Sequence, residues 1–208
     1  LLVSRIPASV GERTARQPRL LLNKRYWLYY VLIFFEGSRV QVFHAFGTLI
    51  LVQEYGWNAQ QISVLLVISA VVNFLLTPRL GRLLDVLGER LTLAASYVLL
   101  AFCFVGYATI RNPWFMGGML VAINLLVLLQ FGLSTYVRRI APPDELTPTL
   151  SAGVSINHVT SVSMSLLAGS LLEVVGYQAL CWGAAAVILL SVPFALAIRV
   201  TAPSSATD

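Results

Sequence analysis

The sequence predicts an all-α membrane protein with six transmembrane helices, and three observations carry this prediction. Of the 208 residues, 58% are hydrophobic and only 11% are charged, whereas a soluble domain carries about 25% charged residues. The mean hydropathy is +0.80. The apolar residues also form continuous runs, which indicate spanning helices because barrel strands would alternate apolar and polar residues.

Six apolar runs are each long enough to cross a bilayer, which takes about 20 helical residues. They cover Trp27–Val52, Gln61–Leu80, Leu91–Thr109, Trp114–Val137, Thr149–Leu172 and Tyr177–Ile198. Turn residues or charges separate them at residues 55–58, 81–90, 111–113, 138–148 and 175–176. We therefore expect a cytoplasmic connector over residues 1–25, a transmembrane half-domain over 26–199 and a cytoplasmic tail over 200–208.

The basic residues predict how these spans are oriented. Twelve of the fourteen lie before the first span, at the end of the second span or after it, after the fourth or after the sixth. These are Arg5, Arg13, Arg16, Arg19, Lys24, Arg25, Arg79, Arg82, Arg90, Arg138, Arg139 and Arg199. The opposite side has Arg111, and Arg39 lies inside the first span. Because cytoplasmic loops carry the excess of Lys and Arg, both chain ends are predicted to be cytoplasmic.

Several other classes of protein are disfavoured. The net charge of +5 could suggest a nucleic-acid partner, but the basic residues lie at span ends, and we expect no nucleic-acid binding. Cys103 and Cys181 lie in apolar runs without metal-ligand spacing and are read as buried thiols. We expect no cofactor and no metal. The chain begins with Leu1 without a signal-peptide pattern, so we expect a fragment of a longer protein.

The turn predicted over residues 81–90 resembles a known motif. Its sequence is GRLLDVLGER, in which Gly81, Asp85, Gly88 and Arg90 match the pattern G-x-L-a-D-r-x-G-r-[RK] of the major facilitator superfamily. In that family the motif lies on the cytoplasmic side between the second and third spans, as it does here. Val86 and Glu89 depart from the pattern at positions that are often basic. From the residues alone, two glycines permit a tight reversal, and Asp85 can accept hydrogen bonds from a helix N-terminus or pair with a neighbouring arginine.

A second resemblance concerns the first and fifth spans. Residues 37–43, GSRVQVF, and the pair Asn157-His158 are similar to motifs of poorly characterised bacterial members of that family. The resemblance implies that the chain is the C-terminal half of a twelve-span transporter in a bacterial inner membrane. It also implies that spans one to three and four to six are inverted repeats. The expected partners are the lipid bilayer, a missing N-terminal six-helix half and a small-molecule solute with proton coupling.

Polar residues are distributed among the spans as this family implies. They occur in the first, second, fourth and fifth spans, whereas the third and sixth have no ionisable or carboxamide side chain in their apolar cores. In the family, the first and fourth helices of each half line the cavity and the second and fifth meet the other half. The third and sixth face lipid. Asn124 in the fourth span is therefore expected to face the cavity.

The first span carries Glu36, Arg39 and His44 near its middle. A charge at this depth costs at least about 2.5–3.5 kcal/mol, so these groups should face protein or water. One interpretation is a self-neutralising pair, Glu36 with Arg39, that only fastens helices together. The other is a cavity-facing cluster in which Arg39 binds an anionic group and Glu36 or His44 takes part in proton coupling. The sequence does not decide between them.

The fifth span has small and polar residues along one side, including Gly153, Asn157, Thr160 and Ser161. Such residues allow helices to approach closely and to hydrogen bond, which favours a packing seam against the missing half. For Asn157 and His158, packing at this seam and contact with solute stay equally open.

The predicted function is secondary transport of a small solute by alternating access, without enzymatic activity. A non-transporting structural membrane protein is the alternative. An intramembrane serine protease is disfavoured because the serines at Gly132-Leu133-Ser134 and Gly153-Val154-Ser155 lack the glycine that should follow.

Overall fold

The protein is helical throughout the part of the chain that the structure describes. The computed structural model describes residues 22–198, apart from the side chains of residues 40–45. A short 3-10 helix, η2, covers Lys24–Tyr26. Five α-helices follow, namely α1 (Trp27–Gln53), α2 (Ala59–Thr109), α3 (Pro113–Leu128), α4 (Phe131–Ile140) and α5 (Pro143–Leu196). The predicted tail and residues 1–21 of the predicted connector lie outside the described range.

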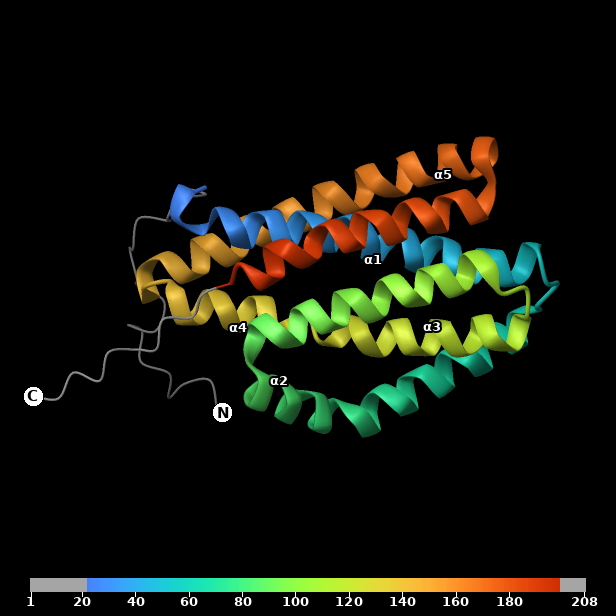
Figure 1. The fold of residues 1–208 in the computed structure, drawn as a ribbon, viewed down its shortest axis with the longest axis horizontal. Helices are drawn as coiled ribbons and strands as arrows, with labels where there is room; N and C mark the ends of the chain where they lie inside the picture. Colours follow the sequence, from blue (N-terminus) through green and yellow to red (C-terminus); the bar gives the residue numbers. More distant parts are fainter. Residues whose placement is uncertain (1–21, 199–208) are drawn as a thin grey trace, which may run out of the picture.

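The two longest helices, α2 and α5, each contain one residue with non-helical backbone. Gly88 has φ 73° and ψ 167°, and Gly176 has φ 77° and ψ 169°. Glycine is favoured at both places because it has no Cβ to clash at positive φ. Figure 1 shows the chain doubling back at both bends. Each helix therefore has two arms, residues 59–87 and 89–109 in α2 and residues 143–175 and 177–196 in α5.

The division of the chain differs from the six predicted spans, because the described residues form five α-helices. The turn expected over residues 81–90 is helical except at Gly88, so the prediction of a ten-residue loop is wrong. The break expected over 138–148 shrinks to Ala141 and Pro142. Pro143 opens α5 there at a position that needs no backbone N–H, and Asp144 and Glu145 complement the helix dipole in the first turn.

Two other predicted turns are confirmed by helix caps. The Asn58 side chain accepts from the Gln61 backbone N–H at 2.9 Å, and the Gln61 side chain accepts from the Asn58 backbone N–H at 2.9 Å. This reciprocal capping box starts α2. At α3, the Asn112 side chain accepts from the N–H groups of Trp114 and Phe115. Both caps satisfy N–H groups that the first helical turn leaves without an intrahelical partner.

The turns lie at two ends of an elongated bundle. The start of α1, the bend at Gly88 and the turn between α4 and α5 lie together on the left in Figure 1, and we call this the basic end. The described basic residues Lys24, Arg25, Arg79, Arg82, Arg90, Arg138 and Arg139 belong to these segments. The α1–α2 turn, the α2–α3 turn and the bend at Gly176 lie on the right and form the far end.

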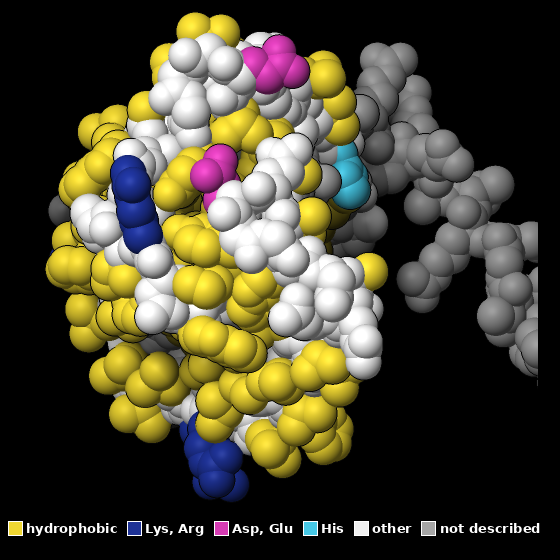
Figure 2. All heavy atoms as spheres, turned by 90° about the vertical axis from the view of Figure 1, so that its right-hand side faces the viewer, with side chains coloured by type: hydrophobic (Ala, Val, Ile, Leu, Met, Phe, Trp, Pro, Cys, Tyr) yellow, Lys and Arg dark blue, Asp and Glu magenta, His cyan; other side chains and the backbone are white. Residues whose placement is uncertain are grey.

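Three helical segments in the described residues are long and apolar enough to cross a membrane: Ala59–Thr109, Pro113–Ile140 and Pro143–Leu196. The first and third have 51 and 54 residues, more than twice the length that one crossing needs, about 20 residues. Figure 2 looks at the far end, where hydrophobic side chains cover most of the surface and few charged ones lie between them. The chain is thus an integral membrane protein by composition and helix length.

The core lies between α1, the second arms of α2 and α5, and α3 with α4. It contains the fully buried side chains of Leu32, Tyr97, Met116, Leu133 and Ile188. The first arm of α2, in contrast, exposes large apolar side chains along most of its length, with Phe74 80% exposed. α5 packs most extensively on α1 and α2.

Candidate functional site

Glu36 and Arg39 lie one turn apart on α1, at a point where this helix comes very close to α5. A Cβ atom added to Gly37 would lie 2.7 Å from the Asn157 carbonyl oxygen, which is too close for any side chain. The Ser161 hydroxyl donates to the Gly37 carbonyl oxygen at 3.2 Å. Glycine at position 37 therefore permits the approach, and the hydroxyl hydrogen bond fastens it.

Gln130 joins the two charged residues of α1. With its amide oriented to satisfy both neighbours, the Gln130 nitrogen donates to Glu36 Oε1. The Gln130 oxygen accepts from Arg39 Nη2 at 2.8 Å and from Arg39 Nε at 3.2 Å. An amide has both donors and an acceptor, so one side chain satisfies a carboxylate and a guanidinium together.

The Arg39 side chain is packed deep inside the bundle. Its residue is 5% exposed, and its guanidinium carbon lies 4.0 Å from the centroid of the Tyr97 ring on the second arm of α2. This cation–π contact stabilises a buried charge. Arg39 Nη1 has no hydrogen-bond partner among the described residues. The cluster Glu36, Arg39, Tyr97 and Gln130, which we call the buried charge cluster, thus draws on three segments of the bundle.

Gln130 lies at a break in the helix that would otherwise run from Pro113 to Ile140. The N–H groups of Leu129 and Gln130 donate to carbonyls three residues back, both at 3.1 Å, and Leu133 does so at 2.9 Å. This tighter 3-10 pattern separates α3 from α4, and such stretches inside long helices often mark hinges. The residue that bridges both charges is therefore carried by the least regular point of its helix.

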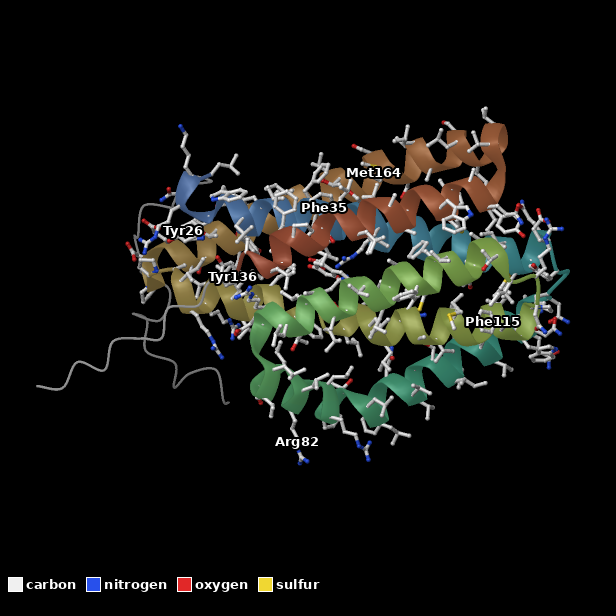
Figure 3. All side chains as sticks on the ribbon, viewed as in Figure 1. Tyr26, Phe35, Arg82, Phe115, Tyr136 and Met164 are labelled. Carbon is white, nitrogen blue, oxygen red and sulfur yellow. The ribbon has the colours of Figure 1, made fainter. Side chains whose placement is uncertain are left out.

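An apolar cavity of about 290 Å³ adjoins the cluster between α1 and the two arms of α5. Ser38 and Arg39 line it from α1, and small residues such as Ala168, Gly183 and Ala184 line it from α5. Figure 3 places Phe35 and Met164 on the same side of the bundle, where α1 and α5 lie next to each other. The cavity is large enough for a small solute, and the residues that line it are mostly apolar.

Among the other predicted site residues, those whose side chains the structure describes do not join this cluster through hydrogen bonds. Asn124 is half-buried and donates to the Leu120 carbonyl of its own helix at 3.0 Å. Asn157 accepts from Ser161 at 3.5 Å. His158 is exposed on α5. The backbone of His44 is in α1, but its side chain lies outside the described part of the molecule. The expected seam residues Gly153, Thr160 and Ser161 pack on α1, within this chain.

The four motif residues sit at the basic end. Gly88 makes the bend, while Gly81, Asp85 and Arg90 are exposed on α2. Asp85 makes no ion pair with Arg82 or Arg90 in the described structure, and Figure 3 shows Arg82 pointing away from the bundle. No group of three or more His, Cys, Asp or Glu side chains in the described residues could hold a metal ion.

Sequence reasoning missed two contacts at the basic end. Glu89, noted only as a departure from the motif, is 2% exposed and forms an ion pair with Arg139 at 3.0 Å. The Tyr26 hydroxyl donates to Glu145 at 2.6 Å. Burial, and then the bond to Glu145, raise the pKa of Tyr26 to about 12.

Sequence reasoning also missed Tyr97, because the third span was expected to face lipid. One side of that span, with Leu93, Tyr97 and Leu100, is buried.

Comparison with known proteins decides the family. Residues 26–208 match the family model of the Major Facilitator Superfamily. The chain belongs to this superfamily. It is also 26% identical over 184 residues to the lysosomal dipeptide transporter MFSD1 of Danio rerio. That match covers 79% of this chain and 37% of the zebrafish protein, so the chain spans well under half the length of its relative.

No solved structure matches the chain. The superfamily assignment confirms the resemblance that the 81–90 motif indicated, and it supports solute transport across a membrane in general. The bacterial branch stays a prediction, and so does the assignment to a C-terminal half.

Proposed function

We propose that this chain is the C-terminal half of a secondary transporter that moves a small solute by alternating access. In this proposal the four arms of α2 and α5, together with α1 and the α3–α4 segment, cross the membrane as six spans in two inverted repeats. The basic end faces the cytoplasm because positive residues stay on that side. The exposed apolar first arms of α2 and α5 then pack against the N-terminal half.

The buried charge cluster is the observation that carries this proposal. A membrane helix keeps a charged pair at depth only at considerable cost, and such residues commonly mark solute or proton pathways. Here Gln130 holds both charges from a break in the opposing helix. A change in the charge of Glu36, or an anion at Arg39, would alter the hydrogen bonds of Gln130 and hence the geometry of that break.

The solute we propose carries a carboxylate and a modest apolar part. Arg39 Nη1 is unpaired in the described structure, and the adjoining cavity is mostly apolar. The zebrafish relative is a dipeptide transporter, so dipeptides are the first compounds to test. A proton gradient is the proposed driving force, with Glu36 or His44 as the coupling group. Asn124, Asn157 and His158 stay candidates for contact with solute.

The test is uptake of labelled dipeptides by the full-length protein in proteoliposomes, with and without an inward proton gradient. Arg39→Gln should lower uptake about tenfold or more, the effect of losing one charge-assisted hydrogen bond. Arg138→Gln, a matched change at an exposed residue near the end of α4, should leave uptake unchanged.

The same assay distinguishes a site from a merely structural pair. Removing both charges in Glu36→Gln/Arg39→Gln leaves no unpaired buried charge, so the protein should fold. If the pair only fastens helices, this double variant would transport normally, which would contradict the proposed role. We expect the double variant to be folded and inactive.

A further inference from the structure

The sequence around the bend at Gly88 recurs around the bend at Gly176. Residues 81–88 read GRLLDVLG, and residues 169–176 read GSLLEVVG. Five of the eight positions are identical, and two others exchange Asp for Glu and Leu for Val. The carboxylates Asp85 and Glu173 stand three residues before the glycine in both copies. Because the bends lie at opposite ends of the bundle (Figure 1), the copies are inverted relative to one another.

The two copies also have the same structure. The glycines at their ends differ by only 4° in φ (73° against 77°) and by 2° in ψ (167° against 169°). Leu83 and Leu171 are 40% and 39% exposed, and Val86 and Val174 are both 82% exposed. Equal burial at matching positions means that each copy presents the same side to its surroundings. Asp85 and Glu173 are exposed in both.

The residue after each glycine extends the correspondence. Glu89 follows Gly88 and pairs with Arg139, at the end of α4. Tyr177 follows Gly176, and its side chain interacts with that of Tyr55, just past the end of α1. In the proposed inverted repeats, α1 of the first repeat corresponds to the α3–α4 segment of the second. The two contacts are then equivalent, because each joins the start of a second arm to the end of the first span in the other repeat. The ion pair holds the basic end, and the tyrosine pair holds the far end.

We propose that residues 169–177 form a gate element at the far end, with Glu173 as its carboxylate, in the way that Asp85 serves the basic end. Neither carboxylate has an ion-pair partner in the described residues, and both stand on exposed first arms. Each accepts hydrogen bonds from a cationic side chain or a helix N-terminus of the other half of the transporter. Asp85 is paired while the basic end is closed, and Glu173 is paired while the far end is closed. This inference rests on the proposed function.

The two carboxylates therefore bias the conformational equilibrium in opposite directions. Removing Glu173 weakens closure of the far end, and removing Asp85 weakens closure of the basic end. A cysteine at Gln53 reports on the far end because Gln53 and Glu173 line the same cavity there. The native Cys103 and Cys181 are buried and do not compete for a membrane-impermeant reagent.

The experiment measures the labelling rate of Gln53→Cys in the full-length protein, using a membrane-impermeant maleimide from the far side and no added solute. Glu173→Gln should raise the rate several-fold, up to about tenfold, and Asp85→Asn should lower it. Glu54→Gln is the matched control, since Glu54 lines the same cavity but lies outside the repeat. It corrects for the local charge effect on the thiol and should change the rate little.

An unchanged or lower rate in Glu173→Gln overturns the inference, and so does a rise of the same size in Glu54→Gln. Because labelling needs no solute, its outcome is independent of the uptake assay. If the two variants shift the labelling rate in opposite directions but the protein takes up no dipeptide, the gate is supported and the proposed solute is contradicted. If the protein takes up dipeptide but neither variant shifts the labelling rate, transport is supported and the gate is contradicted.

Discussion

The two ends of the bundle are built on the same repeat but are held differently. At the basic end, the buried Glu89 pairs with Arg139, and Tyr26 binds Glu145. At the far end, a tyrosine pair stands in place of the ion pair, beside a hollow of about 420 Å³ lined by Glu54, Arg111 and Gln178 among others. The basic end is thus held by a charged contact at a buried carboxylate, whereas the far end is held by a neutral contact beside a hollow.

The largest expected effect on stability comes from adding a methyl group at either of two glycines on the first arm of α5. Gly153 lies toward the basic end and Gly169 toward the far end. A Cβ at Gly153 would lie 2.7 Å from Cζ of Tyr29, a buried side chain with little freedom to move. A Cβ at Gly169 would lie 3.8 Å from Phe46, an ordinary contact. Gly153→Ala should cost about 2–3 kcal/mol through overpacking. Gly169→Ala should be neutral or stabilise by up to about 1 kcal/mol.

Thermal unfolding in detergent, followed by fluorescence-detected size exclusion, measures both variants. Equal losses at the two positions would mean that the basic end is not packed more tightly than the far end.

A smaller difference in stability is expected between variants of the polar contacts at the two ends, Glu89–Arg139 and Tyr177–Tyr55. Glu89→Gln weakens a charge-assisted contact at a buried position and should cost about 1–2 kcal/mol, discounted because Arg139 is half exposed. Tyr177→Phe removes a neutral polar contact with Tyr55 and should cost about 1 kcal/mol or less. The same unfolding assay applies, with Arg138→Gln as the control, since Arg138 belongs to no ion pair in the described residues. A larger loss in Tyr177→Phe would reverse the comparison.

The smallest expected effect is a dependence of stability on pH that Tyr26 contributes at the basic end. The pKa of Tyr26 is raised from 10.0 to about 12, so the folded state favours the protonated hydroxyl. Its stabilising contribution is complete below pH 10 and is lost as the pH rises toward 12. Wild type should lose stability over this window, and Tyr26→Phe should lose less. Parallel curves for the two proteins would assign the loss to other groups.

Much of this arrangement could be predicted from the sequence because membrane helices are set by long apolar runs and by few turn residues. Asn58, Asn112 and Gly176 mark their turns correctly. The loop predicted over residues 81–90 is wrong because its charged residues were interpreted as a turn. Leucine and arginine are good helix formers, and the helix continues as far as Gly88, the residue with positive φ. Glu36 and Arg39 were recognised from their depth. Tyr97 was not, since a tyrosine in an apolar run has no signal until its neighbours are known.

Gly37 and Gly153 have a mechanical consequence. At both glycines α1 and the first arm of α5 approach closely: Gly153 lies against Tyr29 of α1, and Gly37 of α1 lies against Asn157. Along α1, positions 29 and 37 are eight residues apart, about 12 Å. A helix held at two points can neither slide nor rotate against its neighbour without driving backbone into side chains. We therefore expect the two helices to move together, so that a displacement of the α5 arm would also displace Arg39.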